Sequence, residues 1–278
     1  MTGAYDPFAT GPFPVGNRTV QVQDRTYEIW SPEGTQPEAH ALILYSHHSG
    51  GNRLAATYLC KHLCSHGYVV AALDHSPGVN NRVSELRFLL EQVKTSRTQI
   101  GLVGHSLGGW TVLATPDAEP SIKAVVALAP GGNSNPRPGI LRMPLVFHWD
   151  RDVPTLMLVA ENDVCLPLDG MYEIFERMPA TKRMVILRRA DHMHFMDNVE
   201  EVHEAARTMT LTGDLAWIPK EMRPIAELCS GEQSHLFVRG LTLSHMDAVL
   251  KEMEGARRFL AGDIQGELAV RGVEAMVA

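Results

Sequence analysis

Short apolar runs alternate with helix-like stretches along most of this chain. Apolar and polar residues alternate along residues 19–22 and 26–30, which predicts a half-buried pair of antiparallel strands with a turn at Asp24. Six later runs are continuously apolar: residues 41–45, 68–73, 100–103, 122–128, 155–159 and 184–187. Helical segments such as 82–96 separate these runs, and strands that are apolar on both faces are typical of a parallel sheet between two helical layers. The pattern predicts an α/β fold with a mostly parallel central sheet, helices on both faces and short antiparallel strands at the amino-terminal end.

Residues 104–108 read Gly-His-Ser-Leu-Gly and lie where a predicted strand ends and a helix-permissive run begins. A serine between two glycines in this strand-turn-helix context is typical of a nucleophile elbow. The turn holds the serine in strained backbone angles, and side chains two residues away on either side would collide. The motif predicts Ser106 as a catalytic nucleophile and leaves the backbone amide of Leu107 free to donate to an oxyanion. The alternative is a serine with a purely structural role.

A serine hydroxyl is a poor nucleophile near pH 7, so this interpretation requires a histidine base and a carboxylate that orients the base. Asp163 and His192 each follow an apolar run that is predicted to be a strand. Because parallel strands present their carboxyl ends at one edge of a sheet, we expect both residues to lie beside Ser106. Glu161 is the alternative acid. Asp191 is a weaker candidate, because adjacent side chains point apart.

The chain order serine, aspartate, histidine of these candidates is that of the α/β-hydrolases. Within this family the chain resembles the dienelactone-hydrolase-like and platelet-activating-factor-acetylhydrolase-like serine esterases, near the cutinase-like polyesterases. The resemblance covers nearly the whole chain and includes residues 46–53. Phe195 and Asp197 follow His192 by three and five residues, as in the family, which favours His192 over His194 as the base. The resemblance implies an α/β-hydrolase fold and hydrolysis of small-molecule carboxylic esters through an acyl-enzyme, without a cofactor.

Residues 46–53 also carry an implied oxyanion donor. Family members usually read Ser-His-Gly-x-Gly-Gly in this segment, and the residue after the first glycine donates its amide to the oxyanion. The correspondence implies the backbone amide of Ser49 as the second donor beside that of Leu107. His48 stands at the position of the family's glycine, a residue that tolerates backbone angles that histidine does not.

A loop at residues 131–152 leaves the end of a predicted strand beside the expected site. It begins with several prolines and glycines, which argues against a long helix and predicts a pocket-lining loop. The candidates for the wall of the substrate pocket are His48, Trp110, Phe147 and Trp149. For Phe147 and Trp149, packing onto the core is the alternative.

A helical region is predicted for residues 200–278. Its apolar side chains recur at helical spacing and are predicted to face the core, with burial in a dimer as the alternative. They are Leu243, Met246, Leu250, Met253 and Leu260. The sequence leaves open whether residues 215–224 cover the site as a partial lid, and whether the protein is a monomer or a homodimer.

Composition narrows the remaining classes of function. The 278 residues are 45% hydrophobic, enough for one large core, so a single domain over residues 1–278 is predicted. The net charge of −7 provides no basic stripe, which argues against a nucleic-acid partner. No apolar run approaches the ~18 residues of a membrane span and the first residues lack a signal-peptide pattern, so no span and a cytoplasmic location are expected. No metal is expected, because the histidines lack metal-motif spacing such as His-Glu-x-x-His.

Two other functions stay open. The same machinery could serve a thioesterase, an acyltransferase or a peptidase, since loop chemistry separates these enzymes from esterases. The chain could also be a non-catalytic ligand receptor or scaffold on an α/β-hydrolase fold, although a binder needs no complete set of serine, histidine and aspartate.

Overall fold

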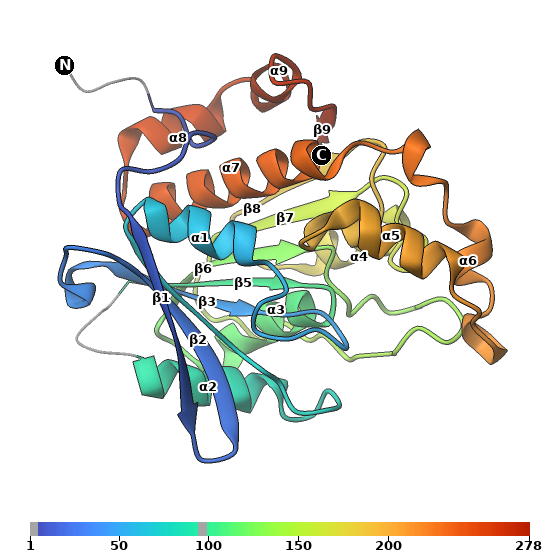
Figure 1. Cartoon of the computed structure of the whole chain (residues 1–278), viewed down its shortest axis with the longest axis horizontal. Helices are drawn as coiled ribbons and strands as arrows, with labels where there is room; N and C mark the ends of the chain where they lie inside the picture. Colours follow the sequence, from blue (N-terminus) through green and yellow to red (C-terminus); the bar gives the residue numbers. More distant parts are fainter. Residues whose placement is uncertain (1–4, 94–98) are drawn as a thin grey trace.

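A nine-stranded sheet forms the centre of the computed structural model, which describes residues 5–93 and 99–278 (Figure 1). In chain order the strands are β1 (Val15–Val22), β2 (Arg25–Pro32), β3 (Ala41–Ser46), β4 (Tyr68–Leu73), β5 (Ile100–His105), β6 (Ile122–Leu128), β7 (Thr155–Ala160), β8 (Lys182–Leu187) and β9 (Ala275–Val277). Their order across the sheet is β1-β2-β4-β3-β5-β6-β7-β8-β9. Strands β3 to β8 pair in parallel, whereas β1, β2 and β9 pair antiparallel. The predicted α/β fold with a mostly parallel sheet is confirmed.

Helices cover both faces of this sheet. They are α1 (Thr57–Ser65), α2 (Arg82–Val93), α3 (Leu107–Ala118), α4 (Leu168–Arg177), α5 (Val199–Thr208), α6 (Ile218–Glu221), α7 (Gly231–Leu250), α8 (Glu254–Ala261) and α9 (Ile264–Ala269), with 3₁₀-helices η1 (Pro37–Ala39), η2 (His192–Phe195), η3 (Gly213–Leu215) and η4 (Ile225–Glu227). Helices α1, α7 and α9 pack into one apolar cluster, and α2, α3 and α4 into another. Successive strand residues enter opposite clusters, as Ile43 and Leu44 do in β3. Burial on both faces explains the continuous apolar runs.

The C-terminal helices depart from the predicted stripe at one residue. Leu243, Met246 and Leu250 are buried as predicted, but α7 ends at Leu250 and Met253 is 39% exposed. The prediction for Met253 is wrong because Glu252 adopts a left-handed φ of 54°, which interrupts the helical period before α8 begins.

Smaller differences concern the ends of elements. The predicted helix 82–96 is observed over Arg82–Val93, and residues 94–98 lie outside the described part of the chain. The strand β9 adds an unpredicted edge to the sheet, because three residues are too few to show an alternating pattern. Among residues 5–93 and 99–278, no helix combines the length and the apolar character that crossing a bilayer requires.

Candidate active site

Ser106 lies at a sharp turn between β5 and α3. Its φ of 58° and ψ of −115° place a non-glycine residue in a strained backbone region, and its amide donates to the Leu128 carbonyl oxygen at 2.9 Å. A Cβ atom on Gly104 would lie 2.2 Å from the Gly108 carbonyl oxygen, and one on Gly108 would lie 1.9 Å from the Ser46 carbonyl oxygen. The close approach of the backbone therefore requires both glycines, as the motif predicts.

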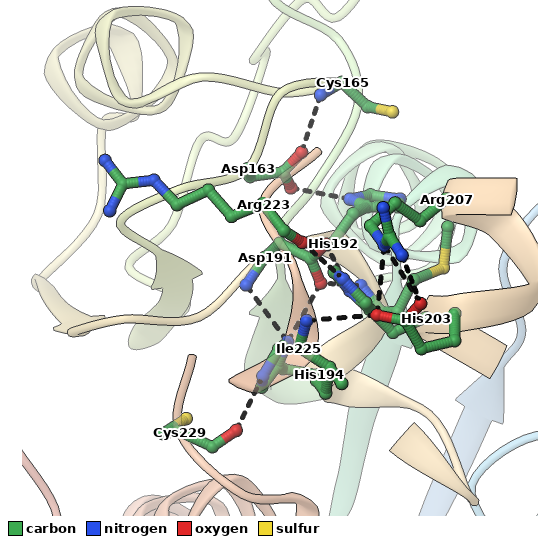
Figure 2. A network of polar contacts seen from close by, with 12 residues as sticks. Asp163, Cys165, Asp191, His192, His194, His203, Arg207, Arg223, Ile225 and Cys229 are labelled. Carbon is green, nitrogen blue, oxygen red and sulfur yellow. Dashed lines mark hydrogen bonds and ion pairs between the residues drawn. The ribbon is translucent and has the colours of Figure 1, made fainter. Parts of the chain in front are cut away.

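The three residues that are predicted to lie together form a chain of hydrogen bonds. His192 Nε2 lies 2.9 Å from Ser106 Oγ, and His192 Nδ1 lies 2.6 Å from Asp163 Oδ2. The other carboxylate oxygen of Asp163 accepts from the backbone amides of Cys165 at 2.9 Å and Leu166 at 2.8 Å (Figure 2 shows Asp163 between Cys165 and His192). Asp163 is buried. Because both of its oxygens are held, its carboxylate fixes the orientation of the His192 ring.

The surroundings of His192 favour the tautomer that a base requires. An ionised carboxylate only accepts hydrogen bonds, so Nδ1–H of His192 donates to Asp163 and Nε2 is left to accept the Ser106 hydroxyl proton. Burial disfavours the charged ring, but the charge and hydrogen bond of Asp163 outweigh burial and raise the pKa of His192 above its ordinary value. An imidazolium at this position is therefore stabilised by its neighbour.

The alternative acids and the alternative base point elsewhere. Glu161 lies 2.6 Å from Arg188 Nε and accepts from the Arg189 amide at 3.0 Å. Asp191 lies 2.9 Å from the Nδ1 atom of His194. Among the three acids considered from the sequence, Asp163 is therefore the one whose carboxylate meets the histidine beside the elbow serine.

Leu107 and Ser49, whose backbone amides are the predicted donors to an oxyanion, both line the cavity that holds Ser106. Leu107 is the first residue of α3, and a helix leaves its first N–H groups without partners inside the helix. Ser49 follows β3 and lines the same cavity as Ser106 and Leu107. His48 is absent from the described non-glycine residues with positive φ. The backbone at this position is therefore open to histidine, and the missing glycine of the resemblance is not needed.

A cavity of about 290 Å³ opens beside Ser106, and its walls are mainly aliphatic. The aliphatic residues that line it are Leu107, Ile140, Leu141, Met143, Leu166, Leu215 and Ile218. Three of them belong to the loop 131–152, where the apolar pair Ile140-Leu141 after the Pro-Gly turn was the available signal. Leu215 and Ile218 bring η3 and α6 of the C-terminal region onto the same wall, a contribution that the sequence left open.

The four predicted pocket residues lie outside the described lining of this cavity. Trp149 is buried in the cluster of α2, α3 and α4, and its ring packs edge-on against Phe147 with centroids 5.3 Å apart. Trp110 Nε1 donates to a backbone carbonyl oxygen of the loop 131–152 at 2.9 Å, and His48 Nδ1 donates to the carbonyl oxygen of the next residue at 2.8 Å. Phe147 and Trp149 therefore take the alternative of packing onto the core, whereas the assignment of Trp110 and His48 to the pocket wall stays a prediction.

A buried cluster of charges supports the turn that follows β8. Asp191 Oδ1 lies 2.9 Å from His194 Nδ1, and Asp191 Oδ2 lies 2.7 Å from His203 Nδ1 (Figure 2). The Nε2 atoms of the two rings donate to the carbonyl oxygens of Cys229 at 3.1 Å and Arg223 at 2.8 Å. Each ring thus faces an acceptor on both sides, which favours the doubly protonated form. The cluster ties η2 to the segment that follows α6.

The same three side chains are the described group whose ligand atoms are close enough to hold a metal ion, within 4.8 Å of one another. The contacts of 2.7 and 2.9 Å are hydrogen-bond lengths, shorter than the roughly 3.3 Å between ligands of a tetrahedral zinc ion. The arrangement fits protons better than a metal.

This cluster predicts a loss of stability at alkaline pH. Burial disfavours the charge on His194, but its hydrogen bond to Asp191, together with the neighbouring Cys229 side chain, outweighs burial and raises the pKa of His194 to about 10. Asp191 likewise outweighs burial and raises the pKa of His203. A histidine whose pKa is raised in the folded state contributes its full stabilisation below its ordinary pKa of about 6.5, and this stabilisation is lost as the pH rises towards the folded-state pKa. The free energy of unfolding should therefore fall between pH 6.5 and about 10.

Urea unfolding at several pH values in this interval measures how steeply the free energy of unfolding falls with pH. The His194→Gln variant is expected to lose most of this slope, whereas replacement of the exposed His148 by glutamine should leave it as in the wild type. Equal slopes for the wild type and His194→Gln would contradict the prediction.

The chain is similar to several known proteins. A family model described as PET hydrolase-like matches residues 4–236. Cutinase est1 of Thermobifida alba is 25% identical over 164 residues, 54% of this chain and 51% of that protein. Cutinase 2 of Thermobifida cellulosilytica is 21% identical over 206 residues, 67% and 72% of the two chains. A bis(hydroxyethyl) terephthalate hydrolase of Streptomyces coelicolor is 23% identical over 182 residues, 61% and 55%.

The matched region thus spans about half the length of the first and third of these relatives. Among solved structures, a ferulic acid esterase from Streptomyces cinnamoneus is similar, with a TM-score of 0.66 and 18% identity. The likeness covers 87% of this chain and 91% of that one. At this identity the likeness concerns the fold alone.

Proposed function

Because this chain belongs to the PET hydrolase-like family of α/β-hydrolases, we propose that it is a serine hydrolase that cleaves carboxylic esters through an acyl-enzyme on Ser106. The observation that carries the proposal is the hydrogen-bond chain from Ser106 Oγ through His192 to Asp163, placed beside an apolar cavity. The names of the relatives, cutinases and a bis(hydroxyethyl) terephthalate hydrolase, support hydrolysis of esters.

In the acylation half of the reaction, His192 Nε2 removes the hydroxyl proton as Ser106 Oγ attacks the ester carbonyl carbon. The electron pair of the C=O double bond moves onto oxygen, and the amides of Leu107 and Ser49 donate to the resulting oxyanion. Asp163 stabilises the imidazolium that forms. Collapse of the tetrahedral intermediate breaks the bond to the alcohol oxygen, which takes its proton from His192.

Deacylation repeats these steps with water. His192 Nε2 removes a proton from a water molecule, whose oxygen attacks the acyl carbon, and the two amides again bind the oxyanion. The intermediate releases the carboxylic acid, and the proton returns from His192 to Ser106 Oγ. Over the two halves His192 passes one proton from Ser106 to the alcohol and one from water to Ser106, so the protons balance.

The wall of the cavity supports an aliphatic group as the part of the substrate that lies next to Ser106. Leu141, Met143 and Ile218 offer flexible aliphatic surface, and burial of apolar area is the main attraction that such a wall can provide. The volume of about 290 Å³ is at the small end of ligand sites, which fits one acyl chain.

Hydrolysis of p-nitrophenyl esters from acetyl to long-chain acyl tests the proposed function. We expect turnover with an optimum set by the cavity, and covalent labelling by a fluorophosphonate in the peptide that contains Ser106. If the protein neither hydrolyses the esters nor reacts with the fluorophosphonate, the proposed hydrolase function is refuted, and a receptor that binds ligand without reacting is favoured. Product assays with added thiols, amines or alcohols separate an esterase from the acyltransferase alternative.

Substitution of the cavity wall should change the preference for acyl length. The Ile140→Trp variant fills part of the cavity, so kcat/KM for long acyl chains should fall by about 10-fold relative to acetyl, as expected when a pocket loses room for a few methylenes. The Val146→Trp variant is the control, because Val146 lies in the same loop but is 55% exposed and outside the described lining. An unchanged length profile in Ile140→Trp would show that the acyl chain lies elsewhere.

A further inference from the structure

Arg82, the first residue of α2, binds the backbone of the loop that carries Ser49. Arg82 Nη1 donates to the carbonyl oxygen of His47, and Arg82 Nη2 donates to the carbonyl oxygen of His48 at 3.2 Å. Arg82 is only 3% exposed. A buried guanidinium that spends two of its donors on consecutive carbonyl groups fixes the path of this loop, because leaving it without these partners would cost the desolvation of a charge.

The ring of His47 supplies a second donor to the same carbonyl group. The amide of His75 donates to His47 Nε2 at 3.1 Å, so Nε2 carries no proton and the ring proton lies on Nδ1. Nδ1 donates to the carbonyl oxygen of His48 at 2.7 Å. Burial lowers the pKa of His47 to about 3, which keeps this neutral tautomer at ordinary pH. The His48 carbonyl oxygen therefore accepts from both Arg82 and His47, one donor for each lone pair.

Fixing this carbonyl group also fixes the amide of the next residue. The C=O of His48 and the N–H of Ser49 belong to one planar trans peptide unit and point in opposite directions. Two donors that hold the oxygen on the α2 side thus direct the N–H to the other side, and Ser49 lies on the wall of the cavity that holds Ser106.

We propose that Arg82 is a positioning residue that holds the Ser49 amide in the oxyanion-binding orientation. The inference rests on the proposed ester hydrolysis and assigns to Arg82 a role in the stability of the tetrahedral intermediate, through the peptide unit between His48 and Ser49. Arg82 does not itself touch the substrate.

Kinetics of the Arg82→Met and Arg82→Lys variants test this role. Removal of one donor to an oxyanion lowers kcat by about 10²- to 10³-fold, so a misdirected donor should lower kcat by roughly 10- to 100-fold while KM changes little. Lysine can reach a carbonyl oxygen but lacks the planar fork, so Arg82→Lys should retain more activity than Arg82→Met. A trifluoromethyl ketone, which forms an oxyanion when Ser106 adds to it, should lose affinity by the factor that kcat/KM loses.

Arg25 provides the matched control. It forms an ion pair at 3.2 Å with Glu85, an acid of the same helix that also holds His75 at 2.8 Å, but it makes no described contact with the loop carbonyls. The Arg25→Met variant removes one positive charge beside α2 and should keep kcat within about twofold of the wild type. A loss as large as that of Arg82→Met would assign the effect to charge or folding and overturn the proposal.

His47→Gln offers a second route, should Arg82→Met fail to fold. Loss of the other donor to the His48 carbonyl oxygen should also lower kcat and ketone affinity together at nearly constant KM. Folded variants at both positions with wild-type kcat and ketone affinity would overturn the inference and leave the proposed function intact. If the wild-type protein shows no ester hydrolysis that depends on Ser106, the proposed function itself is refuted.

Discussion

Replacement of Ser106 by alanine is expected to lower kcat for ester hydrolysis by about 10⁶-fold, the loss seen when a serine nucleophile of a triad is removed. Without Oγ no acyl-enzyme forms, and only binding and the oxyanion donors remain to assist attack by water. The Ser106 side chain has its described hydrogen bond to His192 alone, so the melting temperature should change little. Kinetics with a p-nitrophenyl ester and thermal unfolding of the same preparation measure the two effects.

Ser49→Ala is the matched control for this variant. Ser49 is the other serine on the cavity wall, and the proposed mechanism uses its backbone amide, which alanine retains. Ser49→Ala should therefore keep most of the activity and still be labelled by a fluorophosphonate. A folded Ser106→Ala protein that hydrolyses the ester at the wild-type rate would refute the nucleophile assignment.

The Asp163→Asn variant should lower kcat by about 10⁴-fold, as the comparable change does in a known triad. An amide N–H of the new side chain would donate to His192 Nδ1, which moves the ring proton to Nε2 and leaves no lone pair to accept the Ser106 proton. The two backbone amides at Cys165 and Leu166 would still hold the amide oxygen, so the fold should survive.

The pH profile gives this prediction a second measurement. Asp163 holds the pKa of His192 above its ordinary value, and the base acts only when neutral, so kcat/KM of the wild type should rise through an acid limb above pH ~6.5. In Asp163→Asn the residual activity should rise at lower pH, because the charge that favoured the imidazolium is gone. Glu161→Gln is the control, since Glu161 pairs with Arg188. Severe loss in Glu161→Gln with mild loss in Asp163→Asn would reverse the assignment of the acid.

The elbow shows where prediction from sequence succeeds. Gly104 and Gly108 are required because the backbone of Ser46 and of the helix start leaves no room for a Cβ atom. The crowding at Gly104 lies within the turn itself and that at Gly108 is with β3, and the motif with its apolar flank was a sufficient signal for both. The β1–β2 hairpin was predictable for the same reason, since Val22 and Arg25 pair across a turn of two residues.

The wall of the cavity shows where prediction from sequence fails. Phe147 and Trp149 were candidates because large aromatic rings beside a site often contact substrate, yet their rings pack against each other and the core. Leu215 and Ile218 line the cavity from a segment more than a hundred residues after the elbow, and nothing local marks them. The residues that meet at a pocket depend on the path of each loop above the sheet.

The sequence by itself determined the parallel sheet, the strained serine and the order of serine, aspartate and histidine. Each leaves a signal within a short segment of the chain, a continuous apolar run for a strand buried on both faces and a five-residue motif for the strained turn. Only the tertiary structure decided that Asp163 rather than Glu161 is hydrogen-bonded to His192, and that Arg82 donates to the backbone of the loop that carries Ser49. Such contacts join residues that the strand order brings together, and their geometry is settled by the packing of the whole sheet and its helices.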